Sequence, residues 1–146
     1  MKKNILVSAC LLGEACRYDG KSKPCEAVIA LKNTYNLIPI CPEVMGGLPT
    51  PRTPSEICGE RVLMKDGHDV TKNYNLGART ALAIARENNC TVAILKEKSP
   101  SCGSGLIHNG LFDGGLVEGD GITAQLLKQE NIRVFGESEI TKDFVL

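Results

Sequence analysis

Four short apolar runs, separated by longer amphipathic stretches, constrain the fold of this chain most strongly. The runs contain many β-branched residues and lie at residues 5–7, 37–40, 91–95 and 132–135. Continuous apolar runs, unlike alternating ones, are typical of strands buried on both faces, as in a parallel sheet. The patterns between them predict helices at residues 24–32, 73–88 and 120–131.

This order of strands and helices predicts a single α/β domain over residues 1–146. We expect a parallel sheet of about four to five strands with helices on both faces. Two segments rich in glycine or proline, residues 42–73 and 99–119, are too long to be simple connections and suggest a function. The second segment predicts a small hairpin around Asn109 and Gly110.

The charge balance and the lengths of the apolar runs limit which binding partners the protein can have. The chain has 17 basic and 17 acidic residues, and a protein that grips a nucleic acid polymer usually shows a basic excess. No run approaches the ~20 apolar residues that span a bilayer, and the apolar run that begins at Ile5 is too short for a signal peptide. We therefore expect a cytoplasmic protein with no membrane partner and no nucleic acid polymer, although a free base or nucleoside remains a possible ligand.

Seven cysteines are many for a reduced protein of this size, and in that setting they indicate metal binding or catalysis rather than disulfides. Cys10, Cys41 and Cys102 each follow one of the first three predicted strands. Parallel strands place their carboxyl ends at one edge of the sheet, where ligands bind, so we expect these three thiols to meet. The alternative is that each is an isolated buried thiol, which is the interpretation adopted for Cys25, Cys58 and Cys90.

The donor set favours an iron–sulfur cluster over zinc. Structural zinc usually takes four ligands, often from closely spaced cysteine pairs, and this chain has no such pair. His68 and His108 lie in glycine-rich loops and are expected to face solvent. Three thiolates suit a 4Fe–4S cluster with one iron left open to substrate.

Cys16 is a possible fourth ligand, which would close the cluster and favour electron transfer. The alternative, which we prefer, is a structural thiol beside the site, because a helical first turn after the first strand need not turn Cys16 towards Cys41.

Several polar residues are predicted at the same edge: Glu43, Ser99, Ser101, Arg17, Tyr18, Asp19 and Arg52. A carboxylate beside thiolates resists ionisation, so Glu43 is a candidate general acid. For Arg17, Asp19, Arg52 and Glu56, a network of ion pairs that orders the loops is at least as good an interpretation as contact with substrate.

Four motifs together resemble the thiouracil desulfidase family over nearly the whole chain. They are Ser8-Ala9-Cys10-Leu11-Leu12-Gly13 with Cys16-Arg17-Tyr18-Asp19-Gly20, Cys41-Pro42-Glu43-Val44 with Pro51-Arg52, Leu95 to Gly103, and Gly119 to Ala124. The resemblance implies a Rossmann-like domain with a 4Fe–4S cluster on Cys10, Cys41 and Cys102. It also implies Glu43 as the acid and base, and a functional serine at Ser99 or Ser101.

The activity implied by the resemblance is removal of sulfur from a thiolated base such as 2-thiouracil. Sulfur would bind the open iron, water would attack the carbon, and the oxo-base and sulfide would leave without an electron donor. A cluster implies a need for cluster-assembly machinery, and a homodimer is possible. Two alternatives remain open: a non-enzymatic iron–sulfur or sulfide-carrier module, and a cluster-free thiol enzyme that uses Cys102 or Cys10, for which no histidine partner is evident.

Overall fold

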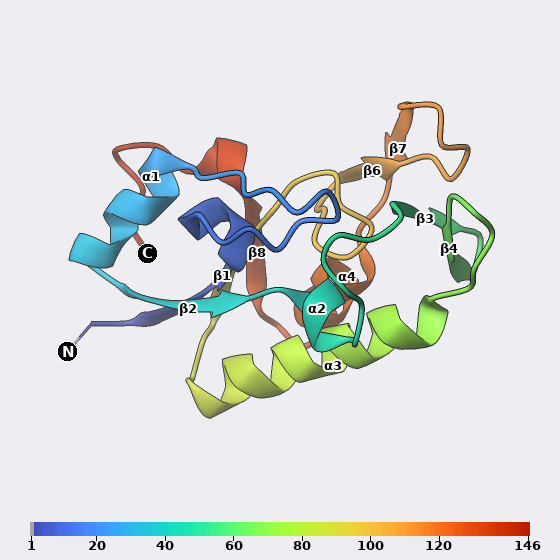
Figure 1. The fold of residues 1–146 in the computed structure, drawn as a ribbon. Coiled ribbons are helices and arrows are strands. Elements are labelled where there is room, and N and C mark those ends of the chain that lie inside the picture. Colours follow the sequence, from blue (N-terminus) through green and yellow to red (C-terminus); the bar gives the residue numbers. More distant parts are fainter. Residues whose placement is uncertain (1) are drawn as a thin grey trace.

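The centre of the protein is a four-stranded parallel sheet. A computed structural model describes residues 2–146, and its central strands are β1 (Asn4–Ser8), β2 (Asn36–Ile40), β5 (Val92–Leu95) and β8 (Arg133–Gly136). Their spatial order is β2-β1-β5-β8, and every neighbouring pair is parallel (Figure 1). The predicted α/β class and the four predicted strands are therefore confirmed.

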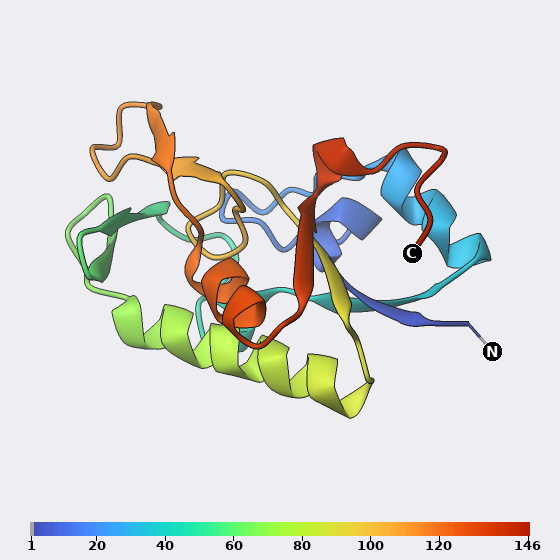
Figure 2. The same ribbon diagram turned by 180° about the vertical axis from the view of Figure 1, so that it is seen from behind.

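Helices cover both faces of this sheet, as predicted. The long helix α3 (Thr71–Glu87) and α4 (Ile122–Gln129) lie side by side on one face (Figure 2). They bury Leu6 and Ala93 of the sheet in one apolar cluster. The short helix α1 (Glu26–Ile29), its 3-10 extension (Ala30–Asn33) and residues near the C-terminus pack on the other face around Ile5 and Val7.

The two long segments contain more structure than the sequence predicted. The first begins with a helix, α2 (Pro42–Met45), and continues into an antiparallel hairpin of β3 (Ser55–Cys58) and β4 (Arg61–Met64). These elements were not predicted, because four-residue elements carry too little periodicity to be recognised. The second segment contains the expected hairpin, β6 (Leu106–His108) and β7 (Leu116–Glu118).

Both hairpins project beyond the carboxyl ends of the central strands (Figure 1). Two further 3-10 helices, Ala9–Leu12 and Glu137–Glu139, follow β1 and β8 directly. Among the described residues, no helix has the length and apolar character needed to cross a membrane.

Close contact between α2 and α3 fixes the position of the segment that follows β2. A Cβ atom at Gly77 of α3 would collide with the carbonyl oxygen of Pro42, and one at Gly46 would collide with the backbone of Asn73. The side-chain amide Nδ2 of Asn73 also donates a hydrogen bond to the Gly46 carbonyl oxygen at 2.8 Å. Glycine at these crossing points allows α2 to lie directly on α3.

We expect Gly77→Ala to lower the free energy of unfolding by about 1–3 kcal/mol, because overpacking a close contact forces the backbone apart. Leu76→Ala is the matched control on α3, since Leu76 is about half exposed, and we expect a change within about 0.5 kcal/mol. Urea unfolding followed by circular dichroism measures both. Equal stability of the two variants would contradict the close packing of α2 on α3.

Candidate functional site

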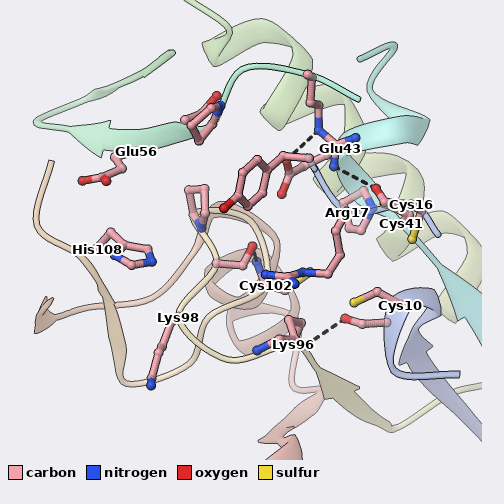
Figure 3. A pocket seen from close by; sticks show the side chains of 18 of the residues that line it. Cys10, Cys16, Arg17, Cys41, Glu43, Glu56, Lys96, Lys98, Cys102 and His108 are labelled. Atoms are coloured by element: carbon pink, nitrogen blue, oxygen red, sulfur yellow. Dashed lines mark hydrogen bonds and ion pairs between the residues drawn. The ribbon is translucent and has the colours of Figure 1, made fainter. Parts of the chain in front are cut away.

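A cavity of about 380 Å³ lies at the carboxyl edge of the sheet, beneath the two hairpins. Cys10, Cys16, Cys41 and Cys102 all line it. Figure 3 shows Cys10, Cys16 and Cys41 at one end of this pocket and Glu56 and His108 at the other, with Glu43 and Cys102 between them. The three thiols predicted to meet therefore share one pocket.

Each of the three cysteines is held by the segment that leaves its strand. Cys10 lies in the 3-10 helix directly after β1, and Cys41 caps the N-terminus of α2 directly after β2. Cys102 lies in the turn after β5, where its backbone N–H donates to Ser99 Oγ at 3.0 Å. Backbone geometry thus positions all three thiols.

Cys16 belongs to the same group of thiols. It lies in an irregular loop, so the predicted helical turn at this position is wrong, and so is the expectation that Cys16 need not face Cys41. Hydrogen bonding to Cys10 raises the pKa of Cys16 to about 11. The Cys41 thiol lies 3.7 Å from the Cys16 carbonyl oxygen, and its hydrogen bond to the Cys16 side chain raises the pKa of Cys41 strongly.

The protein environment disfavours thiolates at this site. Burial, with a smaller contribution from the nearby Glu43 and Cys41, raises the pKa of Cys102 to about 12. Burial also raises the pKa of Cys41. Thiols held close together in this way become thiolates when positively charged metal is present to offset their charge.

The thiols fit a cluster better than a single metal ion. Within residues 2–146, no three His, Cys, Asp or Glu side chains are arranged to hold one ion. A 4Fe–4S cluster binds each thiolate at a different iron, so its ligands surround the cluster rather than converge on one ion. Cys10, Cys41 and Cys102, on three neighbouring loops around one cavity, meet this requirement.

Glu43 is held by Arg52. The guanidinium Nε donates to Glu43 Oε1 at 3.1 Å, and the Arg52 side chain is only 3 % exposed. The same guanidinium donates to the carbonyl oxygen of Cys16 at 3.0 Å and to that of Pro49 at 3.1 Å. Arg52 therefore pairs with the Glu43 carboxylate and joins three segments beside the pocket, so the predicted ion-pair role is confirmed for this residue.

The other charged residues predicted at this edge are Arg17, Asp19 and Glu56. The Nη1 atom of Arg17 lies 3.9 Å from Asp19 Oδ2, and the same guanidinium lies over the ring of Tyr18. Both Arg17 and Tyr18 line the pocket. Among residues 2–146, Glu56 forms no ion pair, so the predicted ion-pair role is wrong for this residue; its carboxylate instead accepts the backbone N–H groups of Gly110 and Phe112 at 2.9 and 3.2 Å. Glu56 thus orders a loop by fastening the second hairpin to the first.

The two candidate serines differ in exposure to the pocket. Ser99 lines the cavity, and its Oγ accepts the N–H groups of Ser101 and Cys102, both at 3.0 Å. A hydroxyl oxygen that accepts twice still has its O–H to donate. Ser101 is fully buried, and its hydroxyl pairs with that of Thr123 at 2.8 Å.

The remaining cysteines are mostly as expected. Cys90 is buried in the core, which raises its pKa, and Cys25 packs against the opposite core cluster. Cys58 was expected to lack partners, which is wrong: its thiol donates to the Gly110 carbonyl at 3.4 Å. Like the hydrogen bonds accepted by Glu56, this contact holds the two hairpins together.

Two pocket residues were missed or misjudged by sequence reasoning. His68 is exposed as predicted, but His108 lines the pocket and its Nδ1 is shielded from solvent, so the solvent-facing prediction is wrong for His108. Tyr74, on α3, lines the pocket as well and is 1 % exposed. Its position within an amphipathic helix is that of a core residue, and only the three-dimensional structure reveals that it faces Glu43.

Fold and site together define a Rossmann-like α/β protein with a thiol-lined pocket at the carboxyl edge of its sheet. A sequence-family model described as 2-thiouracil desulfurase matches residues 5–139. The chain therefore belongs to the 2-thiouracil desulfurase family, which confirms the resemblance found in its motifs.

Two individual proteins are similar over almost their full length. The solved structure of TudS (DUF523Vcz), described as a [4Fe-4S]-dependent thiouracil desulfidase, matches with a TM-score of 0.90 and 47% identity. The match covers 95% of this chain and 93% of that chain. The protein YbbK of Bacillus subtilis (strain 168), described as uncharacterized, is 44% identical over 93% of this chain and 97% of its own length.

We expect Arg52→Met to lower the free energy of unfolding by about 3 kcal/mol, because it leaves the Glu43 carboxylate unpaired in a largely buried site. Arg61→Met is the control, since Arg61 pairs with Asp69 at 2.8 Å but both side chains are exposed; its stability should stay close to that of the unchanged protein. Chemical denaturation measures both. An Arg52 variant as stable as the Arg61 variant would contradict the central role of Arg52.

Proposed function

We propose that this protein is a 4Fe–4S-dependent desulfidase that converts a thiolated base into the corresponding oxo-base and sulfide. Family membership and the likeness to TudS support the activity and the cofactor. The observation that carries the proposal is the meeting of Cys10, Cys41 and Cys102 with the Arg52-bound Glu43 in one pocket.

We assign Cys10, Cys41 and Cys102 as the cluster ligands. With three thiolate ligands, the bound cluster supplies one open iron to which the sulfur of a substrate can bind. Cys16 packs beside these ligands without being one of them, and Arg52 holds its carbonyl oxygen. In the cell, the cluster would be supplied by cluster-assembly machinery.

Glu43 is positioned to activate water. A carboxylate held in place by Arg52 can accept a proton while the water oxygen forms a bond to the thiocarbonyl carbon. The C–S bond then breaks as the new C–OH group becomes a carbonyl, and the hydroxyl proton and the proton held by Glu43 both leave with the sulfur. The balance is one thiobase and one water to one oxo-base and one hydrogen sulfide, so no oxidant or reductant is consumed.

Ser99 is the serine we assign to the reaction. Its O–H is available to a ligand in the pocket, whereas the hydroxyl of Ser101 is committed to Thr123. The donated hydrogen bond would orient a polar atom of the substrate or the attacking water. Ser101 then has a structural role only.

Cluster binding is tested by anaerobic reconstitution, followed by iron analysis and absorption spectroscopy. We expect about four irons per chain, and loss of this iron in Cys10→Ala, Cys41→Ala and Cys102→Ala. Cys16→Ala and Cys90→Ala should retain it, the second being a buried core thiol that is not among the residues lining the pocket. Stoichiometric zinc, or iron retained by Cys41→Ala, would contradict the assignment; iron lost from Cys16→Ala would make Cys16 a fourth ligand.

The acid and base role is tested with variants that keep the cluster. Glu43→Gln should retain iron but lose about 10²- to 10⁴-fold in kcat for 2-thiouracil, measured as sulfide release, because proton transfer is removed. Ser99→Ala should also slow turnover, whereas Ser101→Ala should change thermal stability and leave kcat near its original value. Full turnover by Glu43→Gln would remove Glu43 from the mechanism.

A further inference from the structure

The pocket contains two buried polar atoms that make no hydrogen bond. Among the side-chain nitrogen and oxygen atoms of residues 2–146, only Tyr74 Oη and His108 Nδ1 are shielded from solvent and lack a partner in hydrogen-bonding geometry, and both side chains line the same cavity. Leaving such an atom unpaired costs about 1–3 kcal/mol, and most buried polar groups in proteins are satisfied. Two exceptions in one pocket indicate that the pocket is built for a polar ligand.

The two residues come from different elements and different sides of the pocket. Tyr74 lies on α3, and its hydroxyl lies close to Glu43 and Ser55 without reaching hydrogen-bonding geometry with either. His108 ends strand β6 and lies at the end of the pocket opposite Cys10 and Cys41 (Figure 3). Groups on two sides of a cavity can contact two different edges of one small ring.

Their chemistry matches that of a pyrimidine-like ring. Burial and the nearby Glu43 raise the pKa of Tyr74 well above its usual range, so its hydroxyl remains a neutral hydrogen-bond donor. A neutral imidazole offers one donor and one acceptor. A thiolated pyrimidine presents ring N–H donors and a carbonyl acceptor, whereas a simple thioamide or thiol presents fewer such groups.

The Nδ1 atom of His108 makes no hydrogen bond within the described residues of the hairpins that cover the pocket. Glu56 and Cys58 fasten the loop after β6 to β3 through its backbone, which leaves the imidazole of His108 without a structural partner. Side-chain rotations are common when a ligand binds, and rotation of the His108 ring or of the Tyr74 O–H bond can turn a polar group towards a bound base.

We propose that Tyr74 and His108 are substrate-contacting residues that recognise the polar edges of the heterocycle. This inference rests on the proposed desulfidase function and adds the basis of its specificity. Cys10, Cys41, Cys102 and Glu43 act on the thiocarbonyl group, while Tyr74 and His108 select a ring that carries further N–H and carbonyl groups.

The test uses the cluster-loaded enzyme and two substrates, 2-thiouracil and 2-thiopyridone, the second of which lacks the extra ring N–H and the carbonyl. Tyr74→Phe and His108→Phe keep an aromatic ring and remove the polar atom. We expect each to reduce the preference for 2-thiouracil, as a ratio of kcat/KM values, by about ten-fold, mainly through KM. His108→Asn, which restores a polar group near Nδ1, should recover part of the preference.

Two variants outside the pocket serve as controls. Tyr35→Phe removes a buried hydroxyl that accepts the N–H of Leu146, and His68→Phe removes an exposed imidazole. Both should leave the preference unchanged. An unchanged preference in either pocket variant, or an equal change in its control, would overturn the paired assignment.

Calorimetric binding of uracil, the product, separates this inference from the proposed function. If the unchanged protein releases no sulfide from 2-thiouracil, the proposed desulfidase function is wrong. Uracil binding that weakens about ten-fold in both pocket variants would still support Tyr74 and His108 as the residues that recognise the ring. Uracil binding that is absent, or equal in all variants, overturns this assignment.

Discussion

The parallel register of β2, β1 and β5 is the constraint on which the site depends. Ser8 pairs with Ile40, and Val7 pairs with Ile94, so these strands end at nearly the same level of the sheet. The residues that follow them must then share one edge, however far apart they are in sequence. A slip in register would move a cysteine away from the pocket, and the apolar clusters on both faces of the sheet resist such a slip.

The thiols and the Glu43 carboxylate lie close together at this edge of the sheet. Negative charge on these groups is electrostatically unfavourable unless a positively charged group lies beside them. Neighbouring sulfurs and burial raise the pKa values of Cys16, Cys41 and Cys102. Arg52 is the main compensation, since one guanidinium binds Glu43 and two backbone carbonyls. This arrangement explains how a small domain can keep acid and base chemistry beside a site for iron.

Sequence reasoning predicted the features that arise from local patterns. Apolar runs indicated the four central strands, and the strand ends indicated that Cys10, Cys41 and Cys102 meet. It did not predict α2 or the first hairpin, whose four-residue elements are stabilised by tertiary packing, such as that of Gly77 against Pro42. It also misjudged Cys16 and His108 and did not identify Tyr74, because the direction in which a loop or helix residue points depends on long-range contacts.

The central claim is that the pocket performs hydrolysis, with water as the source of the new oxygen. Anaerobic turnover of 2-thiouracil in ¹⁸O-labelled water, with no reductant present, tests it most directly by mass spectrometry of the product. We predict uracil with one ¹⁸O atom and one equivalent of sulfide for each uracil formed. Unlabelled uracil, or sulfide release that requires an electron donor, would contradict this account.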